Sequence, residues 1–186
     1  MKFSSIDFSL LLPLALCLSF LPLLNAADAN ATAKLIEKAC KDAEYKDLCI
    51  QSLQADEASK DSDLRGLVLL AIRLAGANGS DTLDYIKKIQ NDTSESEPAV
   101  DQCLNECWEH YLSAVEQLDD SIAALLAEAS NDVKTWVEAA IIDAESCEDA
   151  LKEYPGKQSV ILERSTIFRE LCGNALAINK VWAKAN

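Results

Sequence analysis

Long amphipathic stretches, rarely interrupted by glycine or proline, constrain this chain more than any other feature. Its 186 residues include only five Gly and four Pro. After residue 60, apolar residues recur at steps of three and four, the spacing that places them on one face of an α-helix. No stretch shows the strict apolar–polar alternation between turn signals that is typical of strands. The sequence therefore predicts an all-α protein.

The first two predicted helices lie on either side of the polar run QNDTSESEP. The first extends from Leu64 to Ile89 behind the capping residues 61–63, and the last two of its three glycines, Gly76 and Gly79, leave room for a kink or a brief break. Pro98 suits the first turn of the second helix, which runs to Leu125. Its apolar stripe comprises Val100, Leu104, Cys107, Trp108, Tyr111, Val115, Leu118, Ile122 and Leu125.

Two more amphipathic helices are predicted after the second. Ser130-Asn131-Asp132 ends the second helix and caps the third, which ends near EYPGK, and the fourth begins near Gln158. The third stripe comprises Val133, Trp136, Val137, Ala140, Ile141, Ala144, Cys147 and Leu151, and the fourth comprises Ile161, Phe168, Leu171, Cys172, Ala175, Ile178 and Trp182. Four such stripes are best buried against one another, so we predict an antiparallel, up-down-up-down four-helix bundle over residues 61–186.

The N-terminal 26 residues have the layout of a secretory signal peptide. Lys2 precedes an apolar run from Phe8 to Leu24, and small residues stand at Ala26 and Ala27. We expect residues 1–26 to be removed and residues 27–186 to form one secreted domain, with 27–60 as an appendage to the bundle. No later stretch is long and apolar enough to span a membrane. The formal charge of −14 argues against nucleic acid and anionic membranes as partners.

Cysteine usage fits the same oxidising compartment. Of seven cysteines, Cys17 lies in the predicted leader, and the even number that remains indicates disulfides. Cys107 and Cys147 lie on the stripes of successive helices, whereas Cys103 and Cys172 either pair or stay as buried thiols. The remaining two cysteines, Cys40 and Cys49, stand at the two ends of the charged decapeptide CKDAEYKDLC. Sequons at Asn30, Asn78 and Asn91 are candidate glycosylation sites.

Catalytic and metal sites find weak support in the residues. His110 is the only histidine, and it lies on a helical stretch without a nucleophile turn. Neighbouring carboxylates such as Asp119-Asp120 point in different directions on a helix. Cys103, Cys107 and His110 share one helix face and could bind a metal together with Cys147 or Cys172, but an oxidising compartment favours disulfides. We expect no catalytic residue, metal or cofactor; a metal-binding or small-ligand-binding bundle is the alternative of another class.

Nearly the whole mature chain resembles the plant invertase and pectin methylesterase inhibitors. The resemblance runs through CKDAEYKDLCIQSL, DLRGLVLLAIRLA, CLNECWEHYLSAVEQL, WVEAAIIDAESCEDAL and IFRELCGNALAINK. It implies a four-helix bundle carrying an N-terminal helical hairpin, with disulfides Cys40–Cys49 and Cys107–Cys147. The decapeptide would then be the turn of the hairpin, with its charged middle in solvent. Whether the hairpin packs on its own bundle or reaches toward a neighbour stays open, as does the oligomeric state.

The resemblance also implies a function. Such proteins are secreted to the cell wall space or sorted to the vacuole, and they block carbohydrate-active enzymes. Glu109, in C-x-E-x-Y, and Ser146 and Asp149, in S-C-E-D, match target-contact positions of the pectin-type inhibitors; Ser146 stands where the family usually has Thr. Cys103 departs from the family pattern. The Pro-Lys-Phe stretch of invertase inhibitors is absent at Ser130–Lys134. We therefore expect a non-enzymatic apoplastic inhibitor of pectin methylesterase, with acid invertase as the alternative target.

Overall fold

The computed structural model describes residues 30–92, 98–152 and 159–185, so the predicted leader, 1–26, lies outside the described residues. A helical segment, 30–39, is followed by α2 (Lys46–Ala55) and a short 3-10 helix, η1 (Glu57–Asp61). Four long helices come next: α3 (Leu64–Asp92), α4 (Pro98–Leu126), α5 (Ser130–Lys152) and α6 (Ser159–Ala183). All regular structure in these ranges is helical, as predicted.

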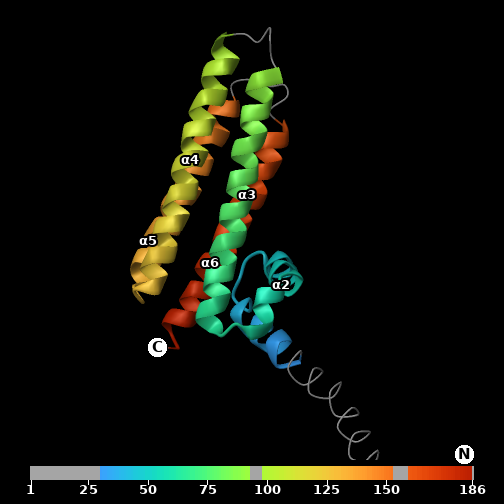
Figure 1. The fold of residues 1–186 in the computed structure, drawn as a ribbon, viewed down its shortest axis with the longest axis vertical. Helices are drawn as coiled ribbons and strands as arrows, with labels where there is room; N and C mark the ends of the chain where they lie inside the picture. Colours follow the sequence, from blue (N-terminus) through green and yellow to red (C-terminus); the bar gives the residue numbers. More distant parts are fainter. Residues whose placement is uncertain (1–29, 93–97, 153–158, 186) are drawn as a thin grey trace, which may run out of the picture.

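The four long helices form the predicted antiparallel bundle (Figure 1). Each packs against its neighbours in the chain, and α3 also packs against α6, which closes the ring. The stripes predicted from the sequence supply the core, in which the rings of Tyr111 and Phe168 meet edge to face with centroids 5.5 Å apart. Burial raises the pKa of the Tyr111 hydroxyl well above its usual value. The sequence expectation of an up-down-up-down bundle is confirmed.

Trp136 is a correction to the predicted third stripe. We expected it on the buried face of α5, but it is 38% exposed. Val133 and Val137 occupy the buried positions around it. At about 100° per residue, Trp136 therefore lies at the margin of the buried face of α5 instead of at its centre.

The N-terminal segment folds as a hairpin on its own bundle, which answers the question that the sequence left open. A disulfide joins Cys40 to Cys49, with Cα atoms 5.9 Å apart. The hairpin packs against α3 and α6 and contributes Ile36 and Leu53 to the common core. Figure 1 shows it beside the end of the bundle where α3 begins and α6 ends. Its apolar residues, and not its charged turn, hold it to the bundle.

Helix α3 begins at its predicted cap and then runs without the break that its glycines allowed. The Asp63 carboxylate accepts a hydrogen bond of 2.7 Å from the Gly66 backbone N–H. The helix continues through both later glycines to Asp92. A Cβ atom at Gly79 would lie 3.0 Å from side-chain carbons of both Phe168 and Val115, whereas one at Gly76 would meet nothing within 4 Å. Gly79 thus lets α3 approach its neighbours closely, while Gly76 has no such packing role.

The two glycines give a matched pair of stability predictions. Gly76→Ala is expected to raise the free energy of unfolding by about 1 kcal/mol, because alanine favours the helix and has room. Gly79→Ala gains the same helix preference but forces Phe168 and Val115 to move, so we expect a net loss of about 1 kcal/mol. Guanidinium unfolding followed by circular dichroism measures both. Equal shifts for the two variants would contradict this packing role of Gly79.

Candidate functional site

Helices α4 and α5 are joined covalently at the middle of the predicted contact region. A disulfide links Cys107 to Cys147; their Cα atoms are 4.5 Å apart and both side chains are fully buried. One turn along, His110 Nδ1 lies 3.0 Å from Asp143 Oδ1, so a polar contact crosses the same pair of helices. These two links fix the register of α4 against α5. The side chains on the outer surface of the pair are therefore held at fixed relative heights.

Glu109, Ser146 and Asp149, the residues predicted to contact a target, all lie on this helix pair. Glu109 is exposed on α4, and no hydrogen bond or ion pair engages it within the described ranges. Asp149 is exposed on α5, its carboxylate 2.7 Å from Lys152 Nζ. That hydrogen bond raises the pKa of the Lys152 ammonium. Ser146 is half-buried, and its hydroxyl donates to the Ile142 carbonyl at 2.9 Å.

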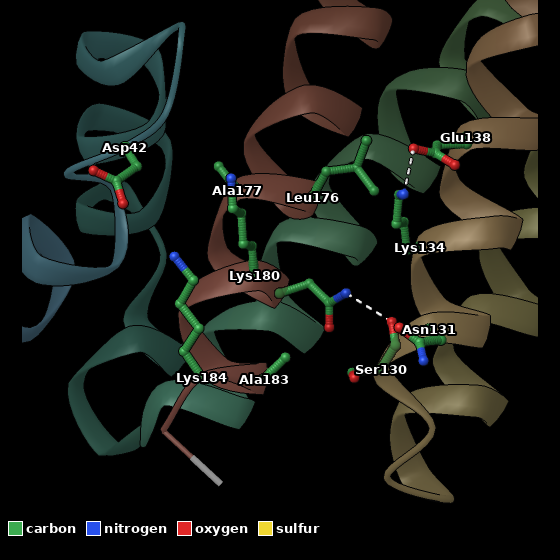
Figure 2. A pocket seen from close by; sticks show the side chains of 11 residues that line it. Asp42, Ser130, Asn131, Lys134, Glu138, Leu176, Ala177, Lys180, Ala183 and Lys184 are labelled. Carbon is green, nitrogen blue, oxygen red and sulfur yellow. Dashed lines mark hydrogen bonds and ion pairs between the residues drawn. The ribbon is translucent and has the colours of Figure 1, made fainter.

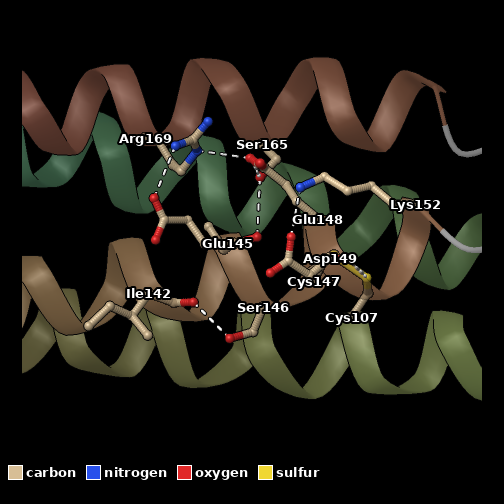
Figure 3. A network of polar contacts seen from close by, with 11 residues as sticks. Cys107, Ile142, Glu145, Ser146, Cys147, Glu148, Asp149, Lys152, Ser165 and Arg169 are labelled. Atoms are coloured by element: carbon tan, nitrogen blue, oxygen red, sulfur yellow. Dashed lines mark hydrogen bonds and ion pairs between the residues drawn. A yellow bond between two sulfur atoms is a disulfide. The ribbon is translucent and has the colours of Figure 1, made fainter.

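Ile142 is the residue at this surface that the sequence reasoning missed. Its side chain is 61% exposed although its neighbour Ile141 packs against the core. Ile142, Ser146 and Asp149 stand at i, i+4 and i+7, so they follow one another along the outward face of α5, which we call the outer stripe (Figure 3). The outer stripe combines an apolar, a hydroxyl and a carboxylate group. A protein partner could recognise that combination by burying one apolar side chain between polar contacts.

The other carboxylates of this part of α5 turn toward α6. Arg169 on α6 donates from Nε to Glu148 at 2.8 Å and from Nη1 to Glu145 at 3.1 Å, and the Ser165 hydroxyl donates to Glu148 at 2.6 Å (Figure 3). Burial lowers the pKa of Arg169, but the attraction of Glu148 and Glu145 outweighs this and raises it overall. Because α6 engages these two carboxylates, the outer stripe keeps a fixed orientation and Asp149 is left facing solvent.

The four residues of the S-C-E-D motif have four different surroundings. Ser146 lies on the outer stripe, Cys147 points inward to the disulfide, Glu148 bonds to α6, and Asp149 returns to the outer stripe. Successive residues of a helix are rotated by about 100°, so four neighbours necessarily face four directions. Only two of the four are available to a partner.

The remaining predicted site residues take structural positions. Cys103 and Cys172 are buried thiols and not a disulfide, and burial raises the pKa of Cys172 well above its usual value. The alternative metal site loses Cys107 and Cys147, whose sulfurs are bonded to each other. Within the described ranges no group of three His, Cys, Asp or Glu side chains could hold a metal ion.

Of the predicted glycosylation sites, Asn30 and Asn91 are exposed, whereas Asn78 is half-buried within α3. Among the residues that the structure describes, no helix has the length and apolar content needed to cross a membrane.

Comparisons with known proteins agree with this architecture. The family model described as plant invertase/pectin methylesterase inhibitor matches residues 34–178. A pectinesterase inhibitor of Actinidia deliciosa is 27% identical over 182 residues, covering 97% of each chain. A Platanus acerifolia protein provisionally named as an invertase inhibitor is 30% identical over 176 residues, covering 91% of this chain and 97% of its own.

The solved structures are consistent with the same fold. A crystal structure of a mutant pectin methylesterase inhibitor from Arabidopsis superimposes with a TM-score of 0.67 at 23% identity, covering 77% of this chain and 95% of its own. At that identity the match bears on the fold alone. Since the family model spans residues 34–178, which include most of the hairpin, both disulfides and the outer stripe, this chain belongs to the plant invertase/pectin methylesterase inhibitor family.

Proposed function

We propose that this protein inhibits a plant cell-wall carbohydrate-active enzyme, with pectin methylesterase as the preferred target, by covering the active-site cleft of that enzyme. The observation that carries the proposal is the outer stripe. Ile142 and Asp149 face solvent, with half-buried Ser146 between them, on a helix that a disulfide and the Arg169 network hold rigidly. A preorganised surface loses little conformational entropy on binding, and this favours a long-lived complex.

Charge supports the same mechanism. The chain carries a formal charge of −14, and Glu109 and Asp149 add two exposed carboxylates at the proposed contact face. We expect the matching surface of the target to be basic. Electrostatic attraction would then speed association, and the packed contacts around Ile142 would slow dissociation.

Acid invertase is the second candidate target. It is favoured by the names of two relatives, the Platanus acerifolia protein and a cell wall/vacuolar inhibitor of fructosidase from Arabidopsis thaliana that is 28% identical over 172 residues. Against it stands the sequence at Ser130–Lys134, which lacks the Pro-Lys-Phe of invertase inhibitors. We therefore place invertase behind pectin methylesterase.

The proposal includes a location and a mature form. Residues 1–26 would direct the chain into the secretory pathway, and residues 27–186 would form the single inhibitor domain, with 27–60 as the hairpin and 61–186 as the bundle. We place the mature protein in the apoplast in preference to the vacuole. It would act without a cofactor and without catalytic residues of its own.

A paired titration tests the function. The protein, produced from the full sequence in a secretory host so that its disulfides form, is added to pectin methylesterase and to acid invertase at acidic pH. We expect stoichiometric loss of methylesterase activity and little loss of invertase activity. The reverse pattern would transfer the proposal to invertase, and full activity of both enzymes at micromolar excess of the protein would refute it.

A further inference from the structure

An open groove lies at the opposite end of the bundle from the C-terminal part of α5, between the hairpin turn, the beginning of α5 and the end of α6 (Figure 2). Its volume is about 490 Å³, within the range of small-molecule sites. A smaller hollow of about 260 Å³ is lined in part by the same residues, Asp42 and Lys184. We call the two together the hairpin groove.

Lysines dominate the charged side chains of the hairpin groove, although the chain as a whole is strongly acidic. The lysines come from every wall: Lys38, Lys41, Lys134, Lys180 and Lys184. Two carboxylates accompany them, Asp42, which lies 3.8 Å from Lys41 Nζ, and Glu138, which lies 3.6 Å from Lys134 Nζ. Both pairs are exposed and therefore weak. The groove keeps a net positive charge in a protein of formal charge −14.

Helix stability accounts for only part of this set of lysines. Lys180 and Lys184 lie at the C-terminal end of α6, where a cation favours the helix dipole. Lys134, in contrast, follows the first turn of α5, where the helix dipole neither favours nor disfavours it appreciably. Figure 2 shows Lys180 and Lys184 extending from α6 into the space before Asp42. Within the described residues, no ion pair engages either of these two lysines.

Asn179 adds a second kind of group to the groove. It lines the larger hollow but is only 4% exposed, and its amide Nδ2 donates to the Ser130 carbonyl at 2.9 Å. Because that bond requires the nitrogen at this position, the Oδ1 atom is fixed as the other end of the amide. Oδ1 is buried without a hydrogen-bond partner in the described part of the chain. Because this atom has almost no accessible surface, a donor in the groove reaches it only if the Asn179 side chain moves.

We propose that the hairpin groove binds a short acidic oligosaccharide, a chain of uronic acid units whose carboxylates meet Lys180 and Lys184. Ammonium groups around an open groove suit carboxylates spaced along a chain. De-esterified pectin has this chemistry and is the product of the enzyme proposed as target, so the choice of this ligand rests on the proposed function, whereas the groove and its lysines do not.

The groove is separate from the proposed inhibitory face. Lys134 and Ser146 are twelve positions apart on α5, which corresponds to about 18 Å along the helix. Acidic sugar binding and enzyme inhibition are therefore expected to be separable by mutation. A protein that carried both would remain attached to the demethylated regions of the wall where its target acts.

Calorimetric titration of the full protein with trigalacturonate tests the proposal at low and at moderate salt. We expect saturable binding that weakens with added salt, and at least about tenfold weaker binding by Lys180→Gln/Lys184→Gln. The matched control is Lys87→Gln/Lys88→Gln, which removes the same charge from exposed positions near the far end of α3 and should bind as the parent does. The groove variant should still inhibit the target enzyme.

Two comparison ligands define the ligand class. Maltotriose has the hydroxyl groups without carboxylates, and propane-1,2,3-tricarboxylate has carboxylates without sugar hydroxyls; both are expected to bind at least about tenfold more weakly than trigalacturonate. Absence of trigalacturonate binding at millimolar concentration, equal loss in the groove and control variants, or equal binding of the tricarboxylate would each overturn the proposal. Loss of enzyme inhibition with sugar binding intact would contradict the proposed function alone.

Discussion

Glu109→Lys/Asp149→Lys is expected to raise the concentration needed for half-inhibition of pectin methylesterase by at least about a hundredfold. Both carboxylates are exposed on the α4–α5 pair, and Asp149 belongs to the outer stripe. Reversing their charge against a basic surface replaces two attractions by two repulsions. The fold should be unaffected, because neither side chain contributes to the core.

The control separates local contact from overall charge. Glu37→Lys/Asp84→Lys makes the same change in net charge at exposed positions on segment 30–39 and on α3. We expect it to alter half-inhibition by less than about threefold and to act mainly on the association rate, through long-range electrostatics. If both double variants lost inhibition to the same degree, the outer stripe would not be the contact surface.

The second large effect is on stability. Cys107→Ala/Cys147→Ala is expected to lower the free energy of unfolding by about 4 kcal/mol, because the disulfide closes a long loop and constrains the unfolded chain. Guanidinium unfolding monitored by circular dichroism gives the value. Replacing both cysteines avoids leaving one buried thiol beside an empty position.

Cys40→Ala/Cys49→Ala provides the comparison. That disulfide spans only nine positions, so the chain-entropy argument gives a smaller loss of about 3 kcal/mol. Removing the α4–α5 bond should also weaken inhibition, since it relaxes the register that sets Glu109 against the outer stripe. A loss below about 1 kcal/mol for the Cys107–Cys147 pair would show that packing alone holds α4 to α5.

The bundle was predictable because its signal is repeated along each helix. Every stripe carries seven or more apolar residues at helical spacing, so single deviations such as Trp136 do not alter the result. Residues whose role depends on contacts with another helix were harder to predict from the sequence. Gly79 disfavours a helix by its own propensity, yet it is retained within α3 because Phe168 and Val115 occupy the space where its Cβ would lie.

The surface features were predictable only in part. The exposure of Ile142 could not be predicted because Ile141 precedes it. Either of two adjacent apolar residues could belong to the buried stripe, and only the orientation of the helix shows which one faces solvent. The hairpin groove has no local signal at all. Asp42, Lys134 and Lys180 come from three distant segments, and only the packing of the hairpin on its own bundle brings them to one groove.

Initial rates of pectin methylesterase, measured over a range of pectin concentrations at several fixed concentrations of this protein, test the central claim most directly. If the α4–α5 face covers the active-site cleft, the protein competes with pectin: the apparent KM rises with its concentration while kcat stays constant. A fall in kcat at constant KM would contradict occlusion of the cleft, and unchanged rates at micromolar excess would contradict inhibition itself.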